Sequence, residues 1–206
     1  MIEAFSLKNA HLFGDALASQ ARLRYLVFVE RRMLEHPHYE DMEYDEFDTP
    51  AAVYLVWRDA RQCVRGVARL VPTIMPYMLE TYWPFLCQTR PLPKAKDIWE
   101  INRVCVDRTV EPKIRRCIFP ELLSATAEFC MMNGIHATVG VTRRHLLDHF
   151  NPQGIEWLGE TAEIEGEQEA AFWMPRESTR PTVHCEKYGI SERVLSLEPV
   201  TGQAAA

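Results

Sequence analysis

The stretch DIWEINRVCVD, residues 97–107, is apolar enough to be a buried strand, yet it contains an acid and a base. Successive side chains of a regular strand alternate between the faces of a sheet, so residues three apart point in opposite directions. Glu100 and Arg103 can therefore act on one side only if the strand is irregular. Because β-bulges break the alternation and gather beside active sites, we predict one at Ile101–Val104. The alternative is a regular strand in which the two residues serve opposite faces.

Segments on the N-terminal side of this strand predict a hairpin and a long connection. Residues 52–58 and 63–71 are strand-like runs joined by four residues, which is typical of an antiparallel pair. Residues 72–94 contain five prolines, and each removes a backbone donor, so we expect at most a helical turn or two there. The strand at 97–107 should therefore extend a sheet that the hairpin has started.

The periodicity becomes helical after the strand. Residues 113–132 predict a helix that ends at Asn133-Gly134, with Pro120 near its first turn or at its start. The other predicted elements are a strand at 3–7, a helix at 15–35, an acidic loop at 36–50, a strand at 135–142, a short helix at 143–150 and strands at 155–162 and 168–174. This order predicts an α/β fold with one mixed sheet and flanking helices, as a single domain over 1–196 with a flexible tail at 197–206.

The composition narrows the class of protein. A net charge of −6 argues against a dominant role in nucleic-acid binding. The 6 cysteines form no C-x-x-C pair, so we expect buried free thiols in a reducing compartment. The N-terminus does not resemble a signal peptide, and the longest apolar run, AAVYLVW, is far too short to span a bilayer. We therefore expect a soluble cytoplasmic protein without a membrane partner.

The sequence lacks the familiar motifs for nucleotide binding, metal binding and covalent catalysis. The sequence contains no G-x-G-x-x-G, G-x-x-x-x-G-K-[ST] or G-x-S-x-G. His145 and His149 are four residues apart, but no third ligand is suggested and H-E-x-x-H is missing, so we expect no metal site.

An acidic loop and several arginines are the candidates for chemistry. The loop EDMEYDEFD, residues 40–48, is either a solvated surface loop or a site for a cation. Arg24 and Phe28 share a helix face because they are four residues apart. Arg69 lies on a strand face with valines, so it needs a carboxylate if buried, from Glu100 or from the acidic loop. A purely structural ion pair would satisfy the same pattern.

Taken together, these elements resemble the acyl-homoserine-lactone synthases, the LuxI-type enzymes that make quorum-sensing signals. The resemblance covers residues 22–106 well and continues loosely to about 175. It rests on the order and separations of Arg24, Phe28, EYDEFD at 43–48, Arg69 in GVARLVPT, and Glu100-x-x-Arg103. It implies a fold like the N-acetyltransferases, with strands that splay to form a cleft. It also implies two substrates, S-adenosylmethionine and an acyl thioester on carrier protein or coenzyme A, and no further cofactor.

Roles for individual residues follow from the resemblance. Glu100 would be the base that deprotonates the amine of S-adenosylmethionine, directly or through a water, with Arg103 beside it. An α-amine has a reference pKa of about 8, so modest help suffices. The residues implied for S-adenosylmethionine are Arg24, Phe28, Asp45, Asp48, Arg69 and Val104.

A second set of residues is expected to form the pocket for the acyl group. Members of the family that make 3-oxo signals often have threonine where this chain has Val139, so we expect an acyl chain without a 3-oxo group. The bulky side chains suggest a short, branched or aromatic acyl group held by Met78, Trp83, Phe85 and Trp99. The chain looks most like the rhizobial branch that uses acyl-coenzyme A, with isovaleryl as the expected acyl group.

Basic residues begin two of the predicted helices. Helix starts with basic side chains are favourable anion sites, so the phosphates of phosphopantetheine or coenzyme A are candidate ligands. The alternative, that these are ordinary solvated lysine and arginine side chains without a ligand, fits the sequence equally well. The residues are Lys113, Arg115, Arg116, Arg143 and Arg144.

Two other functions remain open at the level of sequence. A generic N-acetyltransferase that uses acetyl-coenzyme A would have the same fold, but its usual [RQ]-x-x-G-x-[GA] loop is missing. A non-enzymatic ligand-binding module would leave the ordered set of acids and arginines as a coincidence.

Overall fold

The computed structural model describes residues 1–150, 154–179, 188–191 and 193–200. Within these residues one mixed sheet has the strand order β11-β1-β4-β5-β6-β7-β10-β8, with β9 paired to β10. The strands are β1 Ile2–Ser6, β4 Val53–Arg58, β5 Val64–Pro72, β6 Ile98–Val106, β7 Ala137–Thr142, β8 Glu156–Trp157, β9 Ala162–Ile164, β10 Glu167–Pro175 and β11 Leu195–Ser196. A separate small hairpin joins β2 His38–Tyr39 to β3 Met42–Glu43. The predicted mixed α/β sheet is confirmed.

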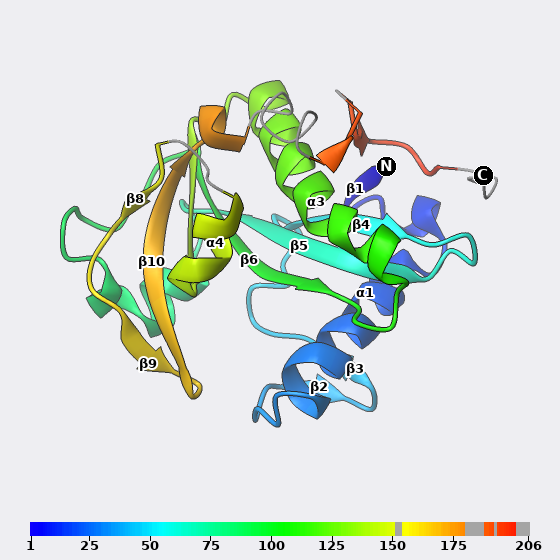
Figure 1. Cartoon of the computed structure of the whole chain (residues 1–206), viewed down its shortest axis with the longest axis horizontal. Coiled ribbons are helices and arrows are strands. Elements are labelled where there is room, and N and C mark those ends of the chain that lie inside the picture. The colour runs from blue at the N-terminus through cyan, green and yellow to red at the C-terminus, as the bar shows by residue number, and fades with distance from the viewer. Residues whose placement is uncertain (151–153, 180–187, 192, 201–206) are drawn as a thin grey trace.

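Helices cover both faces of this sheet (Figure 1). Helix α3, Pro112–Met132, packs on one face through residues such as Ile118 and Leu122. Helix α1, Ala16–Arg24, and the short α2, Met78–Tyr82, lie on the other face. Helix α4 is Arg144–Phe150, and 3₁₀ turns occupy Ala10–Phe13, Pro84–Leu86 and Arg176–Thr179. The core is therefore two apolar layers separated by the sheet.

Three predicted element bounds need correction. A single helix was expected at 15–35. In the structure α1 ends at Arg24, and the chain continues as a π-helical turn, Tyr25–Glu30. The acidic loop contains the β2–β3 hairpin. The strand expected at 155–162 is interrupted, because Leu158 turns its carbonyl to the N–H groups of Gln88 and Thr89, at 2.6 and 3.0 Å.

The position of Pro120 was predicted wrongly. Helix α3 begins at Pro112, which supplies the proline of the first turn, and Pro120 lies in the helix interior. An interior proline removes one helical hydrogen bond and costs about 3 kcal/mol or more. The buried face of α3 on the sheet, which includes Ile118, Leu122 and Phe129, offsets this cost.

Strand β6 contains the predicted bulge. Val67 of β5 pairs with Cys105 and Arg69 pairs with Asn102, so β6 has one residue more than β5 between the two pairs. The extra residue is Arg103, whose φ of 51° lies in the left-handed region. The bulge resets which side chains face which layer: Ile101 and Val104 both face the α3 side, although they are three residues apart. The irregularity expected at Ile101–Val104 is confirmed.

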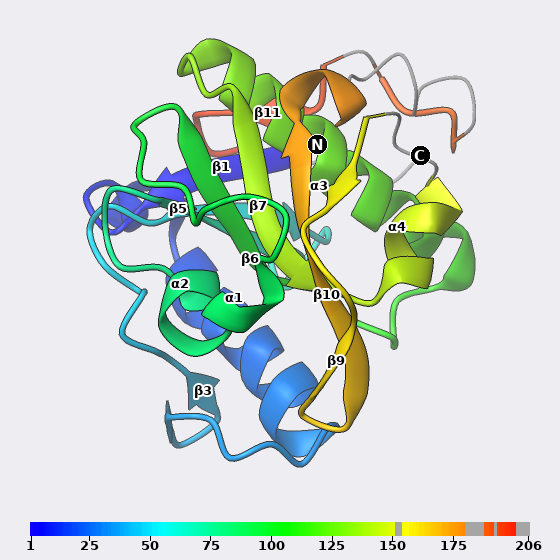
Figure 2. The same ribbon diagram turned by 90° about the vertical axis from the view of Figure 1, so that its left-hand side faces the viewer.

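Strands β6 and β7 separate soon after they meet. They are parallel and pair only at Ile98–Ala137, Trp99–Thr138 and Glu100–Val139, while β6 continues to Val106 and β7 to Thr142. Figure 2 shows β6 and β7 at the centre of the sheet, with α1 and α2 toward one side and α4 toward the other. The splay predicted from the family resemblance is therefore present, and it begins at Glu100.

Some predictions concern residues outside the described ranges. Residues 201–206 of the predicted tail are among them, whereas the N–H of Val200 donates to Glu3 at 2.5 Å. The described cysteines are free, and only Cys105 and Cys130 of them are buried; Cys185 is not described. No described group of three or more His, Cys, Asp or Glu is arranged to hold a metal, and the side chain of His149 is not described. None of the described helices has the length and apolarity to cross a bilayer.

Candidate active site

A cleft opens where β6 and β7 diverge. Its cavity volume is about 380 Å³, and it is bounded by the π-helical turn, β6, α3, α4 and β10. The residues predicted for function that line it are Phe28, Met78, Trp83, Glu100, Arg103, Val104 and Arg143. The splay of the sheet thus brings residues from distant parts of the chain to one concave surface.

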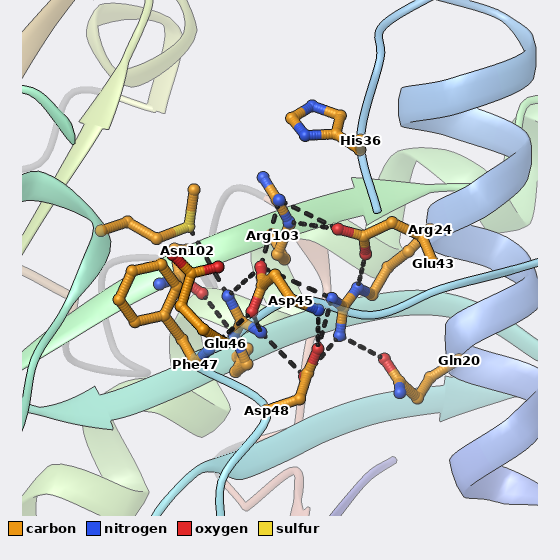
Figure 3. A network of polar contacts seen from close by, with 12 residues as sticks. Gln20, Arg24, His36, Glu43, Asp45, Glu46, Phe47, Asp48, Asn102 and Arg103 are labelled. Atoms are coloured by element: carbon orange, nitrogen blue, oxygen red, sulfur yellow. Dashed lines mark hydrogen bonds and ion pairs between the residues drawn. The ribbon is translucent and has the colours of Figure 1, made fainter. Parts of the chain in front are cut away.

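Three arginines and three carboxylates form a buried network beside the cleft (Figure 3). Arg24 donates to both oxygens of Asp48 at 2.8 Å and also contacts Glu43. Arg69 donates to both oxygens of Asp45, at 2.6 and 2.8 Å. Arg103 lies 2.9 Å from Glu43 and 3.1 Å from Asp45. The network joins α1, β5 and β6 to the acidic segment 43–48.

The acidic segment is therefore only partly a solvated loop. Glu43 is fully buried, and the side chains of Asp45 and Asp48 are 3% and 7% exposed. Glu40, Asp41 and Glu46 are exposed, as the simpler interpretation expects. Each of the buried acids is already bonded to arginine within the network.

Burial and pairing set the protonation of these groups. Burial acts to raise the pKa of Asp48, but the hydrogen bond from Arg24 and the charge of Arg69 hold it well below its usual range. Burial opposes the charge on Arg24 and on Arg69, but the hydrogen bonds and charges of Asp48 and Asp45 outweigh it and raise each guanidinium pKa. Asp48, Arg24 and Arg69 are thus charged at neutral pH.

Glu100 lies next to this network but has a different environment. Its carboxylate accepts the N–H of Leu79 at 2.7 Å, the N–H of Met78 at 3.0 Å and the amide Nδ2 of Asn102 at 2.6 Å. Burial raises the pKa of Glu100 to about 7, and the three hydrogen bonds limit the rise. Arg69 takes its carboxylate from the acidic segment rather than from Glu100. Glu100 is thus a cleft carboxylate that changes protonation near neutral pH.

Arg103 reaches the network because of the bulge. Asn102 and Arg103 are adjacent, yet both contact it: Asn102 accepts from Arg69 at 2.8 Å, while Arg103 pairs with Glu43 and Asp45. The guanidinium of Arg103 also lies over the ring of Phe28, 5.2 Å from its centre. The strand is therefore bulged, and the alternative of a regular strand is wrong: Glu100 and Arg103 both line the cleft, and Arg103 also braces the acidic segment.

The residues predicted for the acyl pocket are not all at the cleft. Met78 and Trp83 line it. Trp99 is adjacent to Glu100 in the regular part of β6, so it faces the other layer, where it packs on the ring of Phe129 with centres 5.7 Å apart. Phe85 is 56% exposed on its 3₁₀ turn. Val139 is buried in the apolar layer that contains Met78, opposite Glu100 where β6 and β7 pair.

Of the basic residues predicted to bind phosphate, only some lie at the cleft. Lys113 and Arg116 are exposed at the start of α3, and Arg115 is half-buried, but none of them lines the cleft. Arg143 lines it, and Arg144 donates to the carbonyl of Gly159 at 2.7 Å.

Sequence reasoning missed several polar residues of the site. The cleft lining includes Arg31, Arg32, Arg108 and Asn102. Arg31 and Arg32 follow Phe28 by three and four residues, so helical spacing was a usable signal for them. A single asparagine within a strand carries no such signal.

Comparison with known proteins decides the family. The sequence profile described as autoinducer synthase matches residues 11–180. The chain belongs to the autoinducer synthase family. The isovaleryl-homoserine lactone synthase of Bradyrhizobium diazoefficiens is 34% identical over 155 residues, which are 75% of this chain and 69% of that protein. This synthase is an acyltransferase, so the predicted family and enzyme class are confirmed.

Solved structures agree with this assignment. The structure of the CoA-dependent acyl-homoserine lactone synthase BjaI with SAM and isopentyl-CoA has a TM-score of 0.84 at 29% identity, covering 98% of this chain and 94% of that one. A Lactobacillus plantarum protein assigned to the N-acetyltransferases has a TM-score of 0.55 at 17% identity, covering 84% and 97%. The second likeness concerns the fold alone and confirms the predicted N-acetyltransferase-like architecture of the synthase.

Proposed function

We propose that this acyl-homoserine-lactone synthase transfers a short branched acyl group, isovaleryl above all, from coenzyme A to the amine of S-adenosylmethionine and then closes the lactone. The observation that carries the proposal is Glu100, a buried carboxylate in the cleft with a pKa of about 7 beside an arginine network. The named relatives support the choice of acyl donor.

In the first step the amine attacks the thioester. The α-ammonium of a free amino acid has a reference pKa of about 8, so Glu100, as a carboxylate, can take its proton directly or through a water. The nitrogen lone pair then forms the amide bond at the carbonyl carbon. The carbon–sulfur bond breaks, and the thiolate of coenzyme A leaves and takes up a proton.

In the second step the carboxylate of the same substrate closes the ring. One of its oxygens attacks the γ-carbon, and the bond from that carbon to the sulfonium breaks with both electrons moving to sulfur. Methylthioadenosine leaves as a neutral thioether. Arg103 lies over Phe28 on the cleft wall, where the guanidinium can orient a carboxylate and the ring can face a sulfonium. Asp45 and Asp48 act in this scheme by holding Arg24, Arg69 and Arg103 in place.

The proposal assigns the acyl chain and coenzyme A to different residues of the cleft lining. Met78 and Trp83 line the cleft, and their bulk favours a short branched chain, while Val139 of the same apolar cluster has no hydroxyl to bond a 3-oxo group. The phosphates fit the cationic side chains of the cleft lining, which are Arg31, Arg32, Arg108 and Arg143. The scheme needs no cofactor in addition to the two substrates. We propose that the protein acts in the cytoplasm, where both substrates are available.

A panel of acyl donors tests the proposal. The protein is given S-adenosylmethionine with isovaleryl-coenzyme A, straight-chain and 3-oxo coenzyme A thioesters, and isovaleryl-carrier protein, and each lactone is identified by its mass. We expect isovaleryl-coenzyme A to give the highest kcat/KM. A higher value for the carrier-protein donor or for a 3-oxo donor would contradict the proposed specificity, and no lactone from any donor would contradict the proposed reaction.

A further inference from the structure

Asn102 connects the carboxylate of Glu100 to the arginine network. Its Nδ2 donates to Oε2 of Glu100 at 2.6 Å, and its Oδ1 accepts from Nε of Arg69 at 2.8 Å. Arg69 in turn holds both oxygens of Asp45. One continuous chain of hydrogen bonds therefore runs from the cleft carboxylate to the acidic segment, and it passes through a residue that no sequence motif singled out.

The orientation of the Asn102 amide is fixed by its two neighbours. A guanidinium has donors and no acceptor, so Arg69 must face the oxygen of the amide. The amide nitrogen must then face Glu100, where it donates. Asn102 is therefore a donor to the carboxylate.

This donor leaves one free acceptor on the carboxylate. An ionised carboxylate offers about four lone-pair positions, two on each oxygen. Both positions of Oε2 are used, by the N–H of Met78 and by Asn102, whereas Oε1 accepts only the N–H of Leu79 among the described partners. The remaining position on Oε1 is the one available to a substrate proton.

We propose that Asn102 is a positioning residue for the synthase reaction: it confines proton transfer to Oε1 of Glu100 and ties the base to the arginine network through Arg69. The proposal rests on the proposed function in one respect, that Glu100 is the base. It adds that the side-chain amide of Asn102 favours the ionised form of the base, together with the backbone N–H groups of Leu79 and Met78 and the charge of Arg69.

The direction of the effect follows from the groups around Glu100. Arg69 on β5 favours its charged form, and Tyr77, just before α2, is a titratable residue near enough for the charge of Glu100 to help raise its pKa. A hydrogen bond donated to a carboxylate favours the charged form, so its loss raises the pKa of the carboxyl. Hydrogen bonds to charged groups are strong enough to move a titration by about one pH unit or more.

Two substitutions remove the donor in different ways. Asn102→Asp keeps an oxygen for Arg69 but cannot donate to Glu100, and Asn102→Ala removes both contacts. Asn133→Asp is the matched control, because it makes the same amide-to-acid change at an exposed position whose nitrogen donates to the carbonyl of Phe129. Thermal unfolding verifies that each variant is folded.

The readout is the titration of Glu100, followed by carbon-13 NMR of side-chain carboxyls and assigned with Glu100→Gln. We expect its midpoint to rise by about one unit or more in both Asn102 variants and to stay in place in Asn133→Asp. The acid limb of kcat/KM against pH should move by the same amount, with rates recovering at high pH.

Unchanged midpoints in both folded Asn102 variants, or a uniform loss of kcat with the acid limb in place, would overturn the proposal. Absence of turnover by the unmodified protein with every acyl donor would instead contradict the proposed function, and the NMR titration would still decide whether Asn102 controls Glu100.

Discussion

Glu100 is buried with N–H donors as its partners, whereas the acids of the neighbouring network are paired with guanidinium groups. The difference explains their opposite behaviour, since an arginine holds the pKa of Asp48 low while burial raises that of Glu100 to about 7. A base is most effective when its pKa lies near the working pH. The residue is thus suited to proton transfer and unsuited to a merely structural ion pair.

The raised pKa makes a prediction about stability. The folded-state pKa of Glu100 lies above its ordinary value of 4.5, so the neutral carboxyl stabilises the fold below that value. This contribution is lost as the pH rises through about 7, because the buried group then ionises. The stability of the unmodified protein relative to Glu100→Gln should therefore fall between pH 5 and pH 8. Urea unfolding at both pH values measures it.

The control for this experiment is Glu163→Gln, which makes the same exchange at an exposed position on β9. Its stability difference from the unmodified protein should be the same at both pH values. A pH-independent difference for Glu100→Gln as well would mean that the Glu100 carboxyl titrates alike in the folded and unfolded chains.

Among the elements, strand β6 determines the site because its bulge changes which residues face the network. The extra residue, Arg103, is a non-glycine residue at a φ of 51°. A side chain in this region costs roughly 1 kcal/mol because its Cβ approaches the following carbonyl oxygen. The ion pairs of Arg103 with Glu43 and Asp45 offset that cost.

The bulge predicts an unusual order of stabilities. Arg103→Gly and Arg103→Ala lose the same ion pairs, but glycine has no Cβ to clash at positive φ. The glycine variant should therefore be more stable than the alanine variant by about 1 kcal/mol in chemical unfolding. At Gln168, a regularly paired and exposed position on β10, the order should be reversed. The same order at both positions would show that residue 103 is not in the left-handed region in solution.

The acidic segment makes a second prediction at the level of elements. Asp48 is buried and bonded to Arg24 and Tyr54, so Asp48→Asn leaves charge uncompensated and should destabilise the protein by about 3–5 kcal/mol. Asp15→Asn breaks an exposed pair with Arg22 and should cost less than about 1 kcal/mol. Chemical unfolding of the two variants compares them directly. Equal and small effects would mean that the network does not hold the segment in place.

Part of this architecture could be predicted from the sequence. An acid and a base within an apolar strand indicated the bulge, and the spacing of strands and prolines indicated the mixed sheet. The burial of Asp45 and Asp48 could not be predicted from the sequence, because it depends on arginines from α1 and β5 that only tertiary packing brings together. Asn102 was missed for a related reason, since its role exists only between Glu100 and Arg69.

Over the whole molecule, the site depends on the limited pairing of β6 with β7. The two strands pair as far as Glu100 and Val139, and beyond that point the sheet opens into a cleft whose walls come from both of its faces. Glu100 lies at the start of the opening, with the arginine network on the α1 side. An acyl thioester and S-adenosylmethionine can in this way meet at one carboxylate.

The most direct test of this account is the joint release of coenzyme A and methylthioadenosine from isovaleryl-coenzyme A and S-adenosylmethionine. The unmodified protein and Glu163→Gln should release the two products in equal amounts. Glu100→Gln should remain folded and lose about 10²–10⁴-fold in turnover, which is the usual contribution of a general base. Full turnover by folded Glu100→Gln would contradict the assignment of Glu100 as the base.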